Sequence, residues 1–228
     1  MTNAYNQEFK NDFSRKGYCI IDVKKLFSSD LMSIKKELDK TTDESWTYVV
    51  KYDDFEADLL SSTELKVIEK HKKAAYRNNS EGKLAYFFKR ITTDHGLTSV
   101  PIAQAFLQAQ GLMDSPAIRR LLEFVTGRDI NDMSQIYINK FEIGDFLGIH
   151  KDGGNNIGVA LNLSKDWITT NGGNTHIVDD EMNIIDSLSP CFGKLLVFDS
   201  MKENVPHFVS TVTSTNNNAR MSIIARYN

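Results

Sequence analysis

The feature that most constrains the fold is a succession of short apolar segments from about residue 134 to the end of the sequence. In these segments apolar residues alternate with polar ones or form brief β-branched runs, as strands do. They cover residues 135–141, 157–163, 194–198, 208–212 and 221–226. Turn-forming clusters separate them at 153–156, 171–174, 189–193 and 216–218. Five or more short strands at this spacing predict a β-sandwich or a β-barrel.

The first 130 residues have a different pattern, in which helical signals dominate. Segment 28–41 begins with two serines that can cap a helix, and its apolar residues then recur every three or four positions. Ser115-Pro116 marks the start of another helix. Two extended segments, 18–23 and 84–90, are rich in β-branched or aromatic residues. We therefore predict an α+β protein with one domain, 1–228, in which a mainly helical layer (1–130) supports a β core (131–228) and covers the substrate.

Composition excludes several classes of protein. The chain has 27 basic and 30 acidic residues, a net charge of −3, so we expect neither a nucleic-acid nor a membrane partner. No apolar stretch approaches the roughly 18 residues of a membrane helix, and the polar N-terminus does not resemble a signal peptide. Cys19 and Cys191 lie too far apart in sequence to indicate a disulfide framework or a thiolate zinc site. We expect a cytoplasmic protein.

Three residues have the chemistry of a metal site. His150 and Asp152 are two positions apart, a spacing that puts both side chains on one face of a strand. His207 follows Pro206 at the start of another predicted strand. Two imidazoles and one carboxylate are the facial triad of non-haem iron(II) oxygenases, which leaves three coordination positions open. On the pair alone, a surface His-Lys-Asp loop and a core histidine are the favoured interpretation.

The context of these residues favours the metal site. Arg220 lies on the last predicted strand, with Ser222 on the same face. The second half of the chain resembles the iron(II)- and 2-oxoglutarate-dependent dioxygenases, specifically their prolyl 4-hydroxylase-like branch. The resemblance spans roughly residues 134–228. It can be followed through Tyr137, 144–147, His150, Asp152, 160–163, Trp167, Gly172, Gly173, Pro190, Gly193, 197–198, His207, Arg220 and Ser222.

This resemblance implies a double-stranded β-helix, or jelly roll, in which His150, Asp152 and His207 bind Fe(II). The enzyme would use O2 and convert 2-oxoglutarate to succinate, with ascorbate as a candidate reductant. Arg220 would pair with the distal carboxylate of 2-oxoglutarate, because a guanidinium binds a carboxylate with two parallel hydrogen bonds. Hydroxyl hydrogen bonds would come from Tyr137 and Ser222. Lys194 and Arg226 are the alternative anchors.

Candidate substrate contacts lie outside the motif. In segment 84–90, either Lys89 or Arg90 can face the pocket, and we favour Arg90 for a substrate carboxylate. Asp132 and Asp145 are candidates for a substrate ammonium group, and Trp167 is either wall packing or a substrate platform. The remaining three histidines are assigned no chemistry: His71 on a solvated helix face, His95 in a loop and His176 as a structural residue.

Three functions from different classes compete. The first is hydroxylation of an unactivated C–H bond in a small molecule, and a free amino acid is the substrate that we favour. The second is hydroxylation of a protein or peptide, as prolyl hydroxylases perform. The third is a jelly-roll binding protein without catalysis, which would have no use for the arginine that the resemblance assigns to the cosubstrate.

Overall fold

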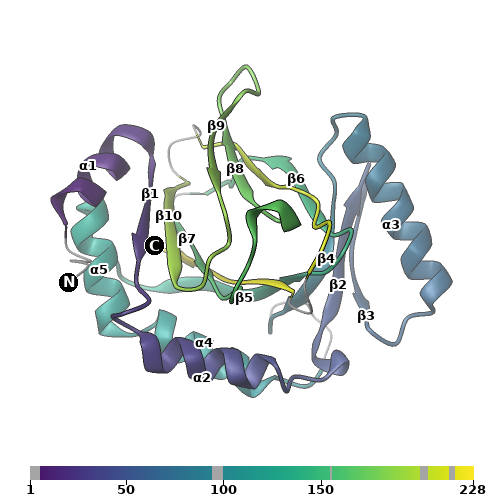
Figure 1. The fold of residues 1–228 in the computed structure, drawn as a ribbon, viewed down its shortest axis with the longest axis horizontal. Helices are drawn as coiled ribbons and strands as arrows, with labels where there is room; N and C mark the ends of the chain where they lie inside the picture. The colour runs from purple at the N-terminus through teal and green to yellow at the C-terminus, as the bar shows by residue number, and fades with distance from the viewer. Residues whose placement is uncertain (1–5, 94–99, 155, 201–204, 216–218) are drawn as a thin grey trace.

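A curled antiparallel sheet occupies the centre of the molecule, and helices cover it on its outer sides (Figure 1). The structure is a computed structural model that describes residues 6–93, 100–154, 156–200, 205–215 and 219–228. The strands are β1 (Tyr18–Asp22), β2 (Thr47–Tyr52), β3 (Phe55–Leu60), β4 (Tyr86–Ile91), β5 (Met133–Phe141), β6 (Phe146–His150), β7 (Ile157–Asn162), β8 (Thr175–Val178), β9 (Ile184–Leu188), β10 (Lys194–Asp199), β11 (His207–Val209) and β12 (Arg220–Tyr227).

The helices begin and end at recognisable signals. They are α1 (Gln7–Lys16), α2 (Ser28–Leu38), α3 (Leu65–Ser80), α4 (Gln104–Met113) and α5 (Pro116–Thr126), with 3-10 turns at Asp43–Ser45 and Thr169–Asn171. In α5 the Ser115 hydroxyl accepts from the Ile118 N–H at 3.3 Å, Pro116 takes the first position, and Gly127 ends the helix at φ 68°. None of the helices in the described ranges has the length and apolar character that a membrane crossing requires.

The order of the strands produces a barrel. Neighbouring strands pair in the order β1-β10-β7-β12-β5-β4-β6-β11-β8-β9, and the β2–β3 hairpin extends from β4. The two strands at the ends of this path meet, because the Tyr18 hydroxyl of β1 donates to the Asp186 carboxylate of β9 at 3.0 Å. The predicted α+β class and the double-stranded β-helix core are both confirmed.

The main hydrophobic core lies between the outer face of the barrel and four helices. Alternation along β12 directs Met221, Ile223, Ala225 and Tyr227 into this core, where they pack with apolar residues of α1, α2, α4 and α5. The buried Tyr227 hydroxyl donates to the Met113 carbonyl at 2.7 Å. The other face of β12 is thereby left to line the inside of the barrel.

The first 130 residues contribute more to the sheet than we predicted. Segments 18–23 and 84–90 are the strands β1 and β4, and both join the barrel rather than a separate layer. The β2–β3 hairpin was not predicted, nor were β6, β8 and β9, which are all six residues long or shorter. Strands this short give a weak periodic signal and depend on their neighbours for stability.

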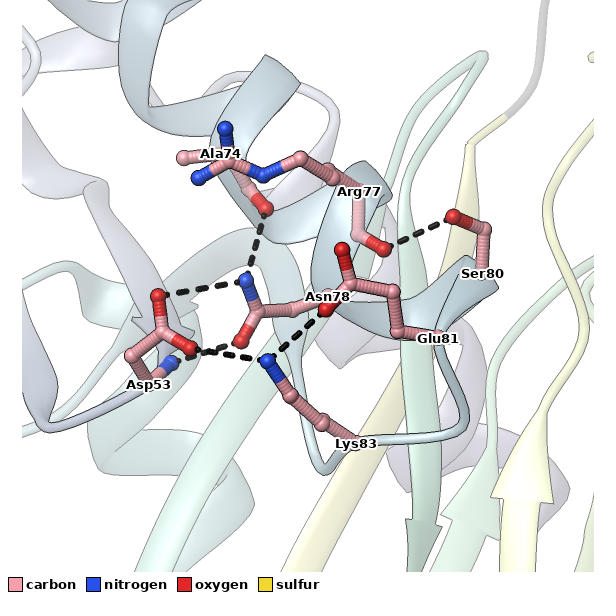
Figure 2. A network of polar contacts seen from close by, with 7 residues as sticks. All are labelled: Asp53, Ala74, Arg77, Asn78, Ser80, Glu81 and Lys83. Atoms are coloured by element: carbon pink, nitrogen blue, oxygen red, sulfur yellow. Dashed lines mark hydrogen bonds and ion pairs between the residues drawn. The ribbon is translucent and has the colours of Figure 1, made fainter.

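The remaining helix, α3, lies on the opposite side of the barrel from α1 and α5 (Figure 1). It packs against the β2–β3 hairpin. Figure 2 shows the network at its C-terminal end. Buried Asn78 accepts from the Asp53 N–H at 2.8 Å, and its amide donates to the Asp53 carboxylate and the Ala74 carbonyl, both at 3.4 Å. Lys83 pairs with Asp53 at 3.5 Å and with Glu81 at 2.7 Å. Because β2 pairs with β4, this network also supports the strand that carries Arg90.

Candidate active site

The two strands that carry the predicted histidines are neighbours in the wall of the barrel. His150 is the last residue of β6 and His207 the first of β11, and these two residues are direct partners in the sheet. Their ring centroids are 4.3 Å apart. The Asp152 carboxylate approaches His150 Nε2 to 3.8 Å and His207 Nε2 to 3.9 Å. The ligand atoms of all three lie within 4.8 Å of one another, and they are the one such cluster among the described residues.

Both imidazoles are oriented toward the cluster by the backbone. Nδ1 of His150 lies 3.0 Å from the Gly148 carbonyl, and Nδ1 of His207 lies 3.0 Å from the Val205 carbonyl. Because a carbonyl only accepts, each Nδ1 carries a proton, and each Nε2 faces the cluster. Burial and the neighbouring His207 lower the pKa of His150 to about 4, so this ring is neutral at physiological pH. Neutral imidazoles are the form that binds metals.

Asp152 is held in its ionised form. Burial alone would raise the pKa of this carboxyl, but the charges of His207 and Arg226 outweigh burial and hold the pKa below its usual value. Arg226, on β12, donates from Nη2 to Asp152 Oδ1 at 2.5 Å. Two imidazoles and one buried carboxylate form a donor set that suits Fe(II).

The second feature of the site is a buried cation deeper in the barrel. The Arg220 side chain is 3% exposed, and burial lowers its pKa to about 10, so it stays charged at neutral pH. Its guanidinium donates to the Gly173 carbonyl at 2.9 Å, to Thr175 Oγ1 at 3.2 Å and to Ser222 Oγ at 3.3 Å. All three acceptors are uncharged, and in the part of the chain that the structure describes no carboxylate pairs with Arg220. A buried arginine without a counter-charge is complementary to an anionic ligand.

A cavity of about 60 Å³ connects the two features. Its walls include the three clustered residues and Arg220; the other lining residues are Tyr137, Asn139, Phe141, Leu147, Ala160, Thr175, Leu196, Phe198, Val209 and Ile224. Two larger hollows, of about 550 and 470 Å³, lie against α2 on the outer side of the barrel and contain none of the clustered residues. Cavity volume alone would therefore select the wrong hollow. The clustered ligand atoms identify the smaller cavity as the site.

The structure separates Lys89 from Arg90, as strand alternation requires. Lys89 is buried on the outer side of the sheet, where its Nζ lies 3.2 Å from Glu142 and 5.0 Å from the Tyr48 ring centroid. The Arg90 guanidinium lies 4.1 Å from the centroid of Tyr137, a cavity residue, and its Nε donates to Asn139 at 3.3 Å.

The other predicted contacts lie as follows. Trp167 is buried against the apolar wall, and its indole N–H donates to the Gly172 carbonyl at 3.0 Å. The Asp145 carboxylate does not line the cavity, since Lys72 binds it at 2.6 Å, and Asp132 is exposed. Lys194 pairs with Asp22 at 3.1 Å, outside the cavity.

The remaining histidines are outside the cluster. His176 stacks on Phe208 at 4.7 Å, which fits a structural role. His71 is less solvated than we predicted, because it stacks on Phe55 at 4.7 Å and lies 3.0 Å from the Tyr52 hydroxyl. His95 falls outside the described residues.

Two polar cavity residues were not predicted. Asn139 and Thr175 both lie on strands and contact the arginines of the site. Asn139 could have been found from Tyr137, because residues two apart on a strand share a face. Thr175 had no such signal, since β8 was not predicted.

Comparisons with known proteins agree with this geometry. The 2OG-Fe(II) oxygenase superfamily profile matches residues 136–227, a segment that contains the histidine–aspartate cluster and Arg220. No curated protein matches the sequence.

Solved structures share the fold at low sequence identity. An oxidoreductase of the 2OG-Fe(II) oxygenase family from Burkholderia pseudomallei is 15% identical, with a TM-score of 0.64, and the match covers 97% of this chain and 90% of that one. A prolyl hydroxylase from Trichoplax adhaerens, in complex with a peptide fragment of the hypoxia inducible factor oxygen degradation domain, is 17% identical, with a TM-score of 0.57 and the same two coverages. IDO from Bacillus thuringiensis is 16% identical, with a TM-score of 0.52, and covers 97% of this chain and 94% of its own.

The matched segment, the barrel and the His-Asp-His cluster together define the class of an iron(II)-dependent oxygenase. Residues 136–227 match the 2OG-Fe(II) oxygenase superfamily. The protein is an oxygenase of this kind, and its cofactor and cosubstrates are Fe(II), 2-oxoglutarate and O2.

Proposed function

We propose that this enzyme hydroxylates an unactivated C–H bond of a small substrate, and that the substrate is a free amino acid. One oxygen atom of O2 would enter the product hydroxyl and the other would enter succinate, with loss of CO2 from 2-oxoglutarate. The observation that carries the proposal is a pair of arginines at one cavity: Arg220 lines it, and Arg90, which does not line it, lies against the lining residue Tyr137. Each of two anionic ligands would then have its own cation.

In this proposal the metal is held by His150, Asp152 and His207. Bound iron would supply the activation of O2 that no protein side chain can perform. The protein orients the two imidazoles through backbone carbonyls and keeps the carboxylate ionised. Its apolar walls, among them Phe141 and Leu196, limit the access of water.

Arg220 would bind the distal carboxylate of 2-oxoglutarate. Its guanidinium is fixed by three uncharged acceptors and by the Phe141 ring, whose centroid lies 4.6 Å away. A cation that is already oriented loses little conformational entropy when the ligand binds. Ser222 and Tyr137 would add hydroxyl hydrogen bonds to the cosubstrate.

Arg90 would bind the carboxylate of the amino acid. Its Nε is engaged by Asn139 and its plane lies against Tyr137, which leaves the terminal nitrogens to form a bidentate contact. The charge of Arg90 interacts with the Glu56 carboxylate, and its guanidinium contacts the Tyr137 ring, the Phe88 ring and Asn139. Lys89 cannot serve in its place, because Glu142 and Asp43 already compensate its charge on the other side of the sheet.

The test is a substrate panel. Purified protein, Fe(II), ascorbate and 2-oxoglutarate are incubated with each free amino acid and, separately, with proline-containing peptides. Succinate and products heavier by one oxygen atom are measured. We expect coupled turnover of at least one free amino acid. If peptides are hydroxylated and every free amino acid is ignored, the peptide hydroxylase alternative replaces this proposal.

A variant tests the role of Arg90. Arg90→Gln should raise the KM for the amino acid, or lower kcat by misplacing the C–H bond, while uncoupled turnover of 2-oxoglutarate persists. Lys73→Gln, on an exposed part of α3, is the control for loss of a positive charge. Unchanged kinetics in Arg90→Gln would show that Arg90 has no role in substrate binding.

A further inference from the structure

We propose that Arg226 is a positioning residue of the metal site, which holds one carboxylate oxygen of Asp152 and leaves the other for the metal. The inference rests on the proposed role of His150, Asp152 and His207 as the metal ligands. It adds a fourth protein residue whose side chain shapes the site without binding the metal.

The contact is buried and engages one oxygen of the carboxylate. Arg226 Nη2 lies 2.5 Å from Asp152 Oδ1, and the two side chains are 15% and 12% exposed. Oδ1 also lies 3.8 Å from His150 Nε2, and the second oxygen, Oδ2, lies 3.9 Å from His207 Nε2. A charge-assisted hydrogen bond in a buried setting is strong enough to fix the rotation of a carboxylate. Both oxygens thus approach the cluster, but Oδ1 accepts a hydrogen bond from Arg226, whereas Oδ2 accepts none from the described residues.

The strand β12 explains why an arginine occupies this place. Arg220, Ser222 and Arg226 are separated by even numbers of residues, so strand alternation directs all three into the barrel. Arg226 lies opposite Gly158 of β7, and the Phe198 ring occupies the space that a side chain at Gly158 would take. The Tyr137 hydroxyl bonds with Arg226 from β5. One strand therefore carries both the proposed 2-oxoglutarate anchor and the residue that orients Asp152.

The consequence concerns the number of free coordination positions. A facial triad leaves three positions on a six-coordinate metal, and 2-oxoglutarate with O2 needs all three. A carboxylate that bound through both oxygens would take one of them. Arg226 prevents this by occupying Oδ1, so its effect is to keep Asp152 a one-oxygen ligand.

Two other interpretations of this contact predict different results. If Arg226 acted only through its positive charge, it would repel a divalent cation, and its removal would tighten metal binding. If the ion pair only stabilised the fold, its removal would leave metal binding unchanged. The sign of the change in metal affinity therefore separates the three.

The experiment uses Mn(II) as the probe with the full chain, without turnover. We compare wild type with Arg226→Met, Arg226→Gln and Arg226→Lys. The control is Arg128→Gln, which breaks the contact of Arg128 with the buried carboxylate of Asp199, where Nη1 lies 3.0 Å from Oδ1. Neither residue of the control pair lines the cavity. Calorimetry gives the Kd, and water-proton relaxation of bound Mn(II) reports the number of exchangeable waters on the metal.

We expect both neutral variants to raise the Kd for Mn(II) by about 10- to 100-fold, the usual effect of losing a partner of a metal ligand. Relaxation per bound Mn(II) should fall by about a third, because a two-oxygen Asp152 displaces one of three waters. Arg226→Lys should recover most of both losses, and Arg128→Gln should leave both values at wild type. If Arg226→Met does not fold, Arg226→Gln alone shows whether the Kd for Mn(II) rises or falls.

An unchanged or lower Kd in the neutral variants would overturn the inference, and so would an unchanged number of waters. Failure of wild type to bind Mn(II) would instead refute the proposed metal site itself. The two failures are therefore distinguishable.

Discussion

Replacement of Arg220 by methionine should abolish tight binding of 2-oxoglutarate while leaving metal binding intact. In the wild type this guanidinium is 3% exposed and is compensated by three uncharged acceptors. Removing it would leave the distal carboxylate of the ligand buried and unpaired. Truncation of one partner of a buried charge pair costs about 2–5 kcal/mol. The Kd for 2-oxoglutarate should therefore rise roughly 30-fold or more, since about 1.4 kcal/mol corresponds to tenfold.

The assay is calorimetric titration of 2-oxoglutarate into protein loaded with Mn(II), together with the Kd for Mn(II) itself. Thermal unfolding of each variant shows that it is folded. Arg128→Gln again serves as the control, because it removes an arginine from a buried ion pair outside the cavity. A Kd for 2-oxoglutarate that stays within threefold of wild type would refute the reasoning. Another cation would then be the anchor.

Three further predictions concern the metal ligand, a buried acid and a turn. Asp152→Ala should abolish Mn(II) binding in calorimetry and all coupled turnover; retention of either contradicts its role as a ligand. Burial raises the pKa of Asp145 to about 6, so the folded state binds this proton more tightly than the unfolded state. The stability of wild type relative to Asp145→Asn should thus fall by up to about 3 kcal/mol as the pH rises from about 4 to 6, and urea denaturation at each pH measures this slope. A flat difference would show that Lys72 cancels the effect of burial. Gly172→Ala should lower the free energy of unfolding by about 2 kcal/mol or more, because φ is +73° and the new Cβ would lie 2.1 Å from the Thr211 carbonyl oxygen. Gly82→Ala, at φ +74° but in open space, isolates the backbone strain, and equal losses in both variants would contradict the steric argument.

The core of the barrel and its metal cluster were predictable from the sequence because local rules determine them. The spacing of residues 150 and 152 brought them together in the prediction, although β6 ends at His150 and Asp152 follows it outside the strand. The strand β12 shows the period of two over its length. Arg226 follows from this period as well, since it is an even number of residues from Arg220. Its contact with Asp152 does not follow, because that contact depends on how β12 and the residues after β6 meet across the barrel.

The parts that sequence reasoning missed depend on tertiary contacts. The strand β8 has four residues, too few for a clear pattern, yet its Thr175 reaches Arg220. The β2–β3 hairpin turns at Asp53, whose φ of 43° is unusual for a residue other than glycine. The bond from the Asp53 N–H to buried Asn78 supports this turn, and that partner lies 25 residues away.

The most direct test of the central claim is a crystal structure of the protein grown with Mn(II) and 2-oxoglutarate without O2. The account predicts one metal ion bound by Nε2 of His150, Nε2 of His207 and the Asp152 carboxylate, at roughly 2.0–2.2 Å. It also predicts the distal carboxylate of 2-oxoglutarate on Arg220. A metal ion on His71 or His176, or 2-oxoglutarate bound away from Arg220, would contradict it.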